Sequence, residues 1–334
     1  MCRFPAVISL VVLSNAAAAN PGPDVEKTIS RGLAFLVKDS LAWKEKHHCA
    51  SCHHASLVIW SLREAKDRGH VVDEQVLAML TKLVAESGDG KFSLARPASA
   101  PKAASPKSIY FALALGTDAR PDVVSQSGLK LLLKTMKSEQ AEDGSWSAWP
   151  ETRPPIFGNS DESLTALATL AVMPVAAAGD GSAKSLLEKG VKWLSQTKSD
   201  EDAQSVALRL VLWVRLGRPA SDWRPLANSI INRQNADGGW SQTKDMASDA
   251  WATGQALYAL AHARIEPNEP VIKRGHAFLM KTQRDDGSWP MTSRPTKPGG
   301  KGSTSLIPIT GAGSAWAVLG LVRSSPAVRT ILEK

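Results

Sequence analysis

The chain has 334 residues, of which 43% are hydrophobic and 22% are charged. This composition supports a large globular core and excludes an intrinsically disordered chain. The formal net charge is +8, but the Lys and Arg residues are scattered rather than clustered, so we expect no nucleic-acid partner.

Residues 1–19 have the features of a signal peptide. Arg3 precedes an apolar run at 5–13, and Ala17 and Ala19 form an Ala-x-Ala cleavage pattern. The run is shorter than the roughly 20 residues that span a bilayer. We therefore expect an exported protein, periplasmic or secreted, with no transmembrane segment in the mature chain.

Residues 24–330 contain an internal repeat. Residues 128–146, 226–240 and 275–289 align, each with an apolar helical pattern, a Gln and then Asp-Gly-x-Trp. An Ala-rich segment with almost no charge follows each copy, starting at Ser160, Ser248 and Gly311. An uncharged helix has to be buried on several sides, so we expect it to be the inner helix, with the charged helix outside.

Weaker copies complete the pattern. The interval from Gly144 to Gly238 is about twice the interval from Gly238 to Gly287, which predicts a degenerate copy at 186–217. Two more copies lie upstream, one at 28–65 and one with Phe92 in place of Trp, followed by a helix from Lys107. Six helical hairpins predict an all-α fold, a single α6/α6 toroid. An open helical array is the alternative, but it would need polar capping units that the sequence does not show.

The repeated motif has a structural explanation. Gln can bond free backbone groups at helix ends, Asp-Gly favours a turn, and Trp can pack on the next outer helix.

The segments 140–146, 234–240 and 283–289 resemble the "QW" repeat of the squalene-hopene and oxidosqualene cyclases and, more distantly, the β subunits of protein prenyltransferases. The resemblance implies a toroid with an apolar central cavity and an isoprenoid substrate. The acidic Asp-x-Asp-Asp motif of those cyclases is absent, and the nearest candidates for catalytic acids are Asp161, Glu162 and Asp249. Asp161 and Asp249 each follow Ser at the start of an Ala-rich helix, so helix N-capping is the alternative.

The segment "HHCASCHH", residues 47–54, replaces the turn of the first repeat. It should therefore lie where an inner helix begins, at one mouth of the toroid. Cys49, Cys52 and His53 match the Cys-x-x-Cys-His signature of covalent haem c attachment, with His53 as the axial iron ligand. The sixth ligand stays open among five candidates: His47, His48, His54, Met246 and Met291.

Two other readings of this segment remain. Cys49 and Cys52 could bind zinc with one or two of His47, His48, His53 and His54. Alternatively, a Cys49–Cys52 disulfide would make the protein a non-catalytic scaffold. Our leading expectation is a binding or redox protein that takes a hydrophobic small molecule or a redox partner protein. The alternative is a terpene cyclase or prenyltransferase type of enzyme, which could use zinc.

Overall fold

The computed structural model describes residues 22–47, 50–87, 104, 106–117, 122–147, 155–156, 160–197, 202–294 and 309–328. The predicted signal peptide at 1–19 lies outside these residues, as do His48 and Cys49. Among the described helices, none is long and apolar enough to cross a membrane.

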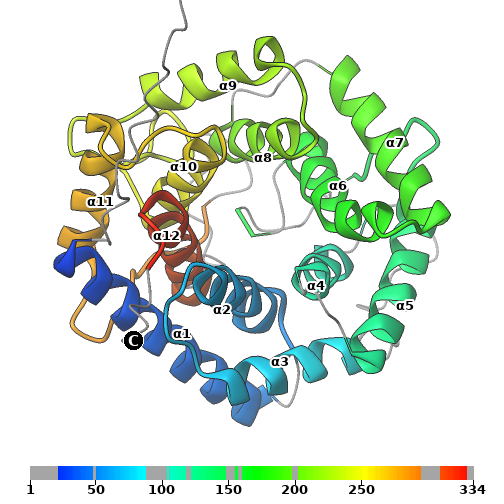
Figure 1. Cartoon of the computed structure of the whole chain (residues 1–334), viewed down its shortest axis with the longest axis horizontal. Helices are drawn as coiled ribbons and strands as arrows, with labels where there is room; N and C mark the ends of the chain where they lie inside the picture. The colour runs from blue at the N-terminus through cyan, green and yellow to red at the C-terminus, as the bar shows by residue number, and fades with distance from the viewer. Residues whose placement is uncertain are drawn as a thin grey trace, which may run out of the picture.

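The described part of the chain forms twelve α-helices in six consecutive pairs. They are α1 (Pro23–His47), α2 (Leu57–Asp67), α3 (Glu74–Glu86), α4 (Pro106–Gly116), α5 (Val123–Glu139), α6 (Asp161–Ala177), α7 (Gly181–Gln196), α8 (Ala203–Arg215), α9 (Ala220–Asn232), α10 (Ala250–His262), α11 (Pro270–Thr282) and α12 (Thr310–Ser324). The odd-numbered helices form an outer ring around the even-numbered ones (Figure 1). The predicted all-α toroid of six hairpins is confirmed.

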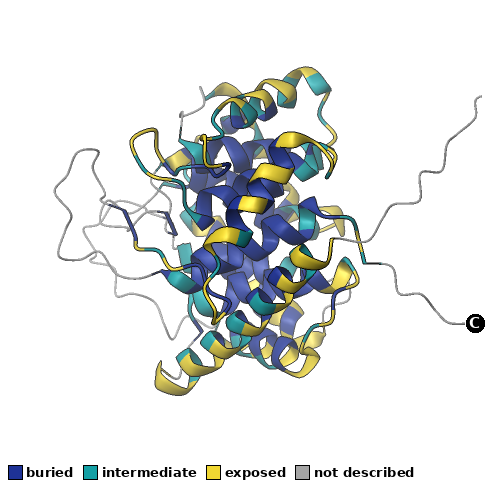
Figure 2. Cartoon of the chain, turned by 90° about the vertical axis from the view of Figure 1, so that its left-hand side faces the viewer, coloured by how far each residue is buried: buried dark blue, intermediate teal, exposed yellow. Residues whose placement is uncertain are grey.

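The inner helices are buried because their sequences consist mainly of apolar residues. Figure 2 shows the buried inner ring enclosed by outer helices whose outward faces are exposed. Glycines let α10 and α12 approach closely: a Cβ atom on Gly254 would lie 2.1 Å from the backbone oxygen of Trp316. Any larger residue at this position would force the two inner helices apart.

The repeated glutamines join neighbouring repeats. Each side-chain amide donates one hydrogen bond to the carbonyl of the turn glycine and a second to a carbonyl of the next outer helix. These bonds, 2.8–3.1 Å long, run from Gln140 to Gly144 and Leu186, from Gln234 to Gly238 and Val271, and from Gln283 to Gly287 and Thr28. The last set closes the ring between α11 and α1. The second acceptor lies within the first two turns of the next helix and not at a free helix end, which corrects the expected role of the glutamine.

The repeated tryptophans hold the same joints from inside. Each indole Nε1 donates to a carbonyl near the end of its own outer helix, at Met136, Ile230 or Leu279. Each ring also packs over a glycine of the next outer helix. A Cβ atom on these glycines would come within 3.1 Å of the indole; the pairs are Trp146 with Gly190, Trp240 with Gly275 and Trp289 with Gly32. The predicted packing of Trp on the next outer helix is confirmed.

We call the end of the ring where the inner helices begin the N-terminal end, and the end where they finish the C-terminal end. Because every inner helix runs in the same direction, residues from the last turns of different inner helices meet at the C-terminal end (Figure 1).

Candidate functional site

A cavity of about 800 Å³ opens at the C-terminal end of the ring. Its lining comes mainly from the last turns of the inner helices and from one face of α5. The lining residues are Trp60, Glu64, Asp67, Leu115, Gly116, Thr117, Gln126, Leu129, Lys130, Leu133, Pro174, Val175, Ala178, Asp180, Arg215, Tyr258, His262 and Arg323. We expected an apolar cavity with its site at the N-terminal mouth. This cavity is at the other end and is mixed in character, because charged residues such as Glu64, Arg215 and Arg323 lie near the ends of inner helices.

Aromatic side chains form the inner boundary of this cavity. The ring of Trp60 lies 5.5 Å from that of Tyr258 and 5.0 Å from that of Trp316, and both pairs meet edge to face. Trp251 extends the cluster from Trp316, 5.9 Å away, towards the N-terminal end. In each edge-to-face contact, the partially positive edge of one ring lies against the partially negative face of the other.

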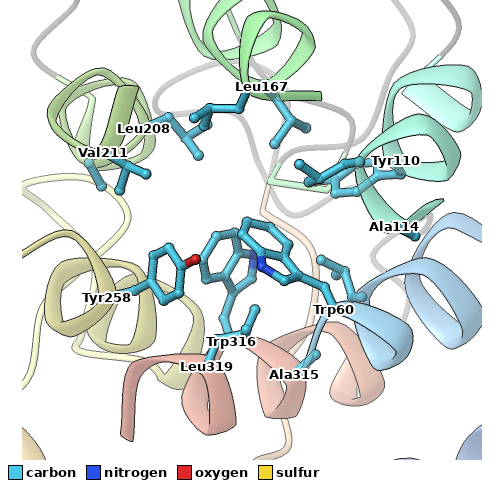
Figure 3. Packing of buried hydrophobic residues seen from close by; sticks show 14 of the residues in the cluster. Trp60, Tyr110, Ala114, Leu167, Leu208, Val211, Tyr258, Ala315, Trp316 and Leu319 are labelled. Atoms are coloured by element: carbon cyan, nitrogen blue, oxygen red, sulfur yellow. The ribbon is translucent and has the colours of Figure 1, made fainter. Parts of the chain in front are cut away.

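The other side of the ring centre is mainly aliphatic. In Figure 3, Trp60, Trp316 and Tyr258 project from α2, α12 and α10, while Leu167 of α6 and Leu208 of α8 lie across from them, with Tyr110 of α4 on the same far side. The buried ring centre is therefore packed with aromatic and aliphatic side chains.

Three charged or polar groups of the cavity rim bond to one another. Arg323 binds Glu64 through an Nη1–Oε1 contact of 2.9 Å. The hydroxyl of Tyr258 donates to the other oxygen of Glu64 at 3.3 Å. Burial, reinforced by the charge of Glu64, raises the pKa of Tyr258, so the phenol stays protonated. The carboxylate of Glu64 is thus balanced within the protein.

Two other groups of the rim have no such partner. His262 Nε2 is buried and makes no hydrogen bond with the described residues. Burial, together with the charges of Arg323 and Arg215, lowers the pKa of His262 to about 3, so the imidazole is neutral at pH 7. Arg215, in the last turn of α8, makes no hydrogen bond or ion pair within the described part of the chain.

The three predicted catalytic acids all lie at the N-terminal end, and none lines the cavity. Asp161 is exposed and accepts a hydrogen bond from Ser147 Oγ at 3.1 Å. The N-cap of α6 is Ser160, whose hydroxyl accepts from the amide of Ser163. The N-capping alternative is therefore wrong for Asp161.

Glu162 is almost fully buried, with 1% of its side chain exposed, and pairs with Arg209 Nε at 2.7 Å. Arg209 also donates to the carbonyl of Thr197. This pair ties α6 to α8 and to the loop before α8.

Asp249 does cap α10, as the alternative predicted. Its Oδ1 accepts from the amide of Ala252 at 2.8 Å, and its Oδ2 accepts from Gln242 Nε2 at 2.7 Å. Burial raises the pKa of Asp249 despite these hydrogen bonds and the nearby charge of Arg294. Burial therefore favours the protonated form of Asp249.

The Cys-His segment leads into the inner helix α2 through a π-helical turn, Cys52–Ser56. Ser51 caps this turn, since its hydroxyl accepts from the amide of His54 at 2.8 Å, and Ser40 Oγ donates to the carbonyl of His54. The segment therefore lies at the N-terminal end, as predicted. π-helical turns are rare in proteins, and those that occur are often found at functional sites.

The rings of His47, His53 and His54 lie around the indole of Trp43. The ring of Trp43 stacks on those of His47 and His54, at 3.9 and 4.0 Å. His54 Nδ1 lies 3.2 Å from Ser51 Oγ and its Nε2 lies 3.4 Å from Asp39 Oδ2. Both ring nitrogens of His54 are thus close to polar partners.

Burial keeps the imidazoles of His53 and His54 neutral. It lowers the pKa of His53 to about 4. Burial, with a smaller effect of His53 and His47, lowers that of His54 to about 3. Neutral imidazole is the form that binds metals. Among the described residues, no group of three or more His, Cys, Asp or Glu is arranged to hold a metal, and His48 and Cys49 are not among them.

The two methionines considered as haem ligands lie apart in the fold. Met246 is in a turn between α9 and α10, where its amide donates to Thr243. Met291 lies against Gly313 of α12, and Gly311 of the same helix lies beside Asp39 and His54. Met291 is therefore the one placed against a helix that reaches the Cys-His segment.

Sequence reasoning missed the residues of the cavity rim. Glu64, Arg215, His262 and Arg323 each stand in the second half of an inner helix. The signal was a charged or ionisable residue late in four of the inner helices.

Solved structures share this fold. A variant of the type II terpene cyclase MstE from Scytonema, in complex with its substrate geranylgeranyl dihydroxybenzoate, superimposes with a TM-score of 0.60 at 13% identity, covering 91% of this chain and 98% of that one. An ent-copalyl diphosphate synthase from Streptomyces platensis gives 0.54 at 16% identity, covering 81% of this chain and 50% of that one. A polysaccharide lyase gives 0.57 at 12% identity, covering 89% and 97%.

These similarities establish the terpene-cyclase-like toroid fold and, at such low identity, not the activity. No protein-family model matches the sequence, and no curated protein matches it.

Proposed function

We propose that the protein binds an elongated isoprenoid inside the toroid and acts on it as an enzyme of the terpene cyclase type. The aromatic cluster supports this proposal most directly. It runs from Trp251, two residues from Asp249, to Trp60 and Tyr258 at the cavity. Trp251 and Tyr258 are two turns of α10 apart, about 10 Å along the axis. Aromatic faces stabilise cations, including the carbocations of cyclisation.

Asp249 is our candidate for the proton donor. In acid-initiated cyclisation, a carboxyl group gives its proton to a terminal double bond, rings close, and the final cation loses a proton, so the product is an isomer of the substrate. Asp249 fits this role better than Glu162, which is paired with Arg209, or Asp161, which is exposed. The substrate would extend along the ring axis from Asp249 past Trp316 to the cavity.

Conversion of linear isoprenoids tests this proposal. The full chain is incubated with geranylgeraniol and with squalene, and the products are separated by gas chromatography with mass detection. We expect a product of unchanged mass with fewer double bonds. Asp249→Asn should abolish it while preserving the fold, because Asn also caps helices well. Asp161→Asn is the matched control and should keep the activity. Loss of activity in both variants, or in neither, would contradict the role of Asp249.

A second candidate function rests on the Cys-His segment. The Cys49-x-x-Cys52-His53 signature, whose His53 lies in the π-turn with a buried, neutral imidazole, is suited to covalent haem c and a redox role. His53 is the candidate axial ligand because it directly follows Cys52 in the signature. Haem would add electron transfer to the toroid. The same residues could instead bind zinc, or Cys49 and Cys52 could form a disulfide. The experiment below distinguishes these two outcomes from covalent haem.

The haem hypothesis is tested by expression in a bacterial periplasm that has haem-attachment machinery. A Soret band that survives denaturation, disappears in Cys49→Ser/Cys52→Ser and changes in His53→Ala but not in His54→Ala would support covalent haem. A colourless protein with stoichiometric zinc would favour the metal site. A colourless protein without metal would favour the disulfide, which thiol titration checks.

A further inference from the structure

The cavity at the C-terminal end is built for a molecule with two unlike parts. Part of its lining is apolar, from Trp60 at the ring centre to Leu115, Pro174 and Leu129 near α5. The rest is charged or polar, and part of it lies near the ends of α2, α8, α10 and α12. An entirely apolar ligand would leave this second part unused.

Three of the six charged side chains in the lining already have a role in the protein. Glu64 is neutralised by Arg323 and receives the hydroxyl of Tyr258. Asp180 caps α7, since its Oδ1 accepts from the amide of Ala183 at 2.8 Å. Asp67 and Lys130, of opposite sign, complete the charged lining.

Arg215 and His262 are less exposed than Asp67 and Lys130. They stand at the ends of the neighbouring inner helices α8 and α10 and line the same cavity. After burial and the charge of Arg323, the charge of Arg215 also lowers the pKa of His262. Neither has a hydrogen-bond partner within the described residues. A guanidinium with free N–H groups beside a neutral imidazole offers several donors and few acceptors.

We infer that Arg215 and His262 bind the anionic headgroup of an amphiphilic ligand whose apolar chain lies against Trp60 and Tyr258. This inference rests on the proposed function and specifies its substrate class as isoprenoids that end in a carboxylate or a phosphate. A guanidinium pairs with either group through parallel N–H···O bonds. The charged end of the ligand would lie at the C-terminal end of the ring, and the end that receives a proton would lie towards Asp249.

A structural role for Arg215 predicts something different. Arginine in the last turn of a helix can complement the partial negative charge of that helix end. In that case, removing Arg215 would lower thermal stability and would affect charged and neutral ligands alike.

The test compares three ligands with the same chain and different heads: geranylgeraniol, geranylgeranoic acid and geranylgeranyl diphosphate. Affinity for the full chain is measured by calorimetry for the wild type, for Arg215→Met and for Arg224→Met. Arg224 is an exposed arginine of the outer helix α9, so its variant removes the same charge away from the cavity. The two charged ligands distinguish a carboxylate site from a phosphate site.

We expect at least one charged ligand to bind the wild type about tenfold or more tightly than the alcohol, as charge-assisted hydrogen bonds allow. Arg215→Met should remove this preference while leaving the alcohol unaffected, and Arg224→Met should retain it. His262→Leu should reduce the preference by a smaller factor.

Two results would overturn the inference in distinguishable ways. If the alcohol binds as tightly as both charged ligands, or if Arg215→Met weakens all three equally, the headgroup site is wrong and the cavity remains an isoprenoid site. If the wild type binds none of the three ligands, the proposed function itself fails.

Discussion

The two ends of the toroid use charged side chains differently. At the N-terminal end, Glu162 pairs with Arg209 at 2.7 Å and Asp202 lies 3.5 Å from Arg294, so buried charges tie loops to helices. At the C-terminal end, Arg215 and His262 face a cavity without partners in the described residues. The same ring of helices thus has one end where charge stabilises the fold and one where charge is available to a ligand.

This difference has a simple origin. The loops between outer and inner helices join at the N-terminal end, where the turn motif and the caps hold them. At the C-terminal end, α4 stops at Gly116, which opens the ring centre towards α5. Charged residues at the C-terminal end therefore line the cavity, whereas charged residues at the N-terminal end contact other groups of the protein.

The largest expected effect is the loss of a buried ion pair at the N-terminal end. Glu162→Gln leaves Arg209 buried without its counter-charge, which should cost about 3–5 kcal/mol of unfolding free energy. Glu64→Gln at the C-terminal end should cost much less, since the charge of Arg323 is nearer to solvent. Urea denaturation of both variants measures the difference, and equal losses would contradict the contrast between the two ends.

Acid should weaken the fold through its buried histidines, of which His262 and His276 lie at the C-terminal end and His53 and His54 at the N-terminal end. The pKa values of His262 and His276 are lowered to about 3 and about 4, mainly by burial, below the ordinary 6.5. Between pH 6.5 and 4 the unfolded chain therefore binds protons that the folded chain does not, and stability falls as pH falls. The melting temperature should drop between pH 7 and pH 5, and His262→Gln should reduce that drop. An unchanged drop would show that His262 does not titrate this way.

Asp249 allows its role as a cap to be separated from its proposed role as an acid. Asp249→Ala removes the acceptor for the amide of Ala252 and should cost about 0.5–2 kcal/mol. Asp249→Asn should keep most of that stability. Thermal melts of the two variants check this, and equal destabilisation by Asn and Ala would mean that Asn does not preserve the cap.

The smallest effect is expected at the rim of the cavity. Tyr258→Phe removes a 3.3 Å hydrogen bond to Glu64 and should cost about 0.5–1.5 kcal/mol or less, because Arg323 still balances the carboxylate. A larger loss in a denaturation experiment would indicate that Tyr258 is part of the structural framework and not of an open rim.

The hairpins and the toroid could be predicted from sequence because they depend on local patterns. Charged and uncharged helices alternate, and Gln140 and Trp146 recur at fixed distances from each turn. The pairing of each Trp with a glycine in the next outer helix was missed, since Gly32, Gly190 and Gly275 look like ordinary breaks within helices.

The resemblance implied a cavity, but its position and its charged lining could not be predicted, because they are properties of the assembled ring. Glu64, Arg215, His262 and Arg323 are far apart in the chain and come together only when six inner helices close. The position of the Cys-His segment at the start of α2 was predicted correctly, since it replaced a recognisable turn. Its cofactor stays a prediction.

A structure of the protein with bound geranylgeranoic acid would test the central claim most directly. We predict that the apolar chain lies against Trp60 and Tyr258, that the carboxylate binds Arg215 beside His262, and that the far end extends towards Trp251 and Asp249. Ligand bound with its carboxylate at the N-terminal end, or only on the outer surface of the ring, would contradict this assignment of the two ends.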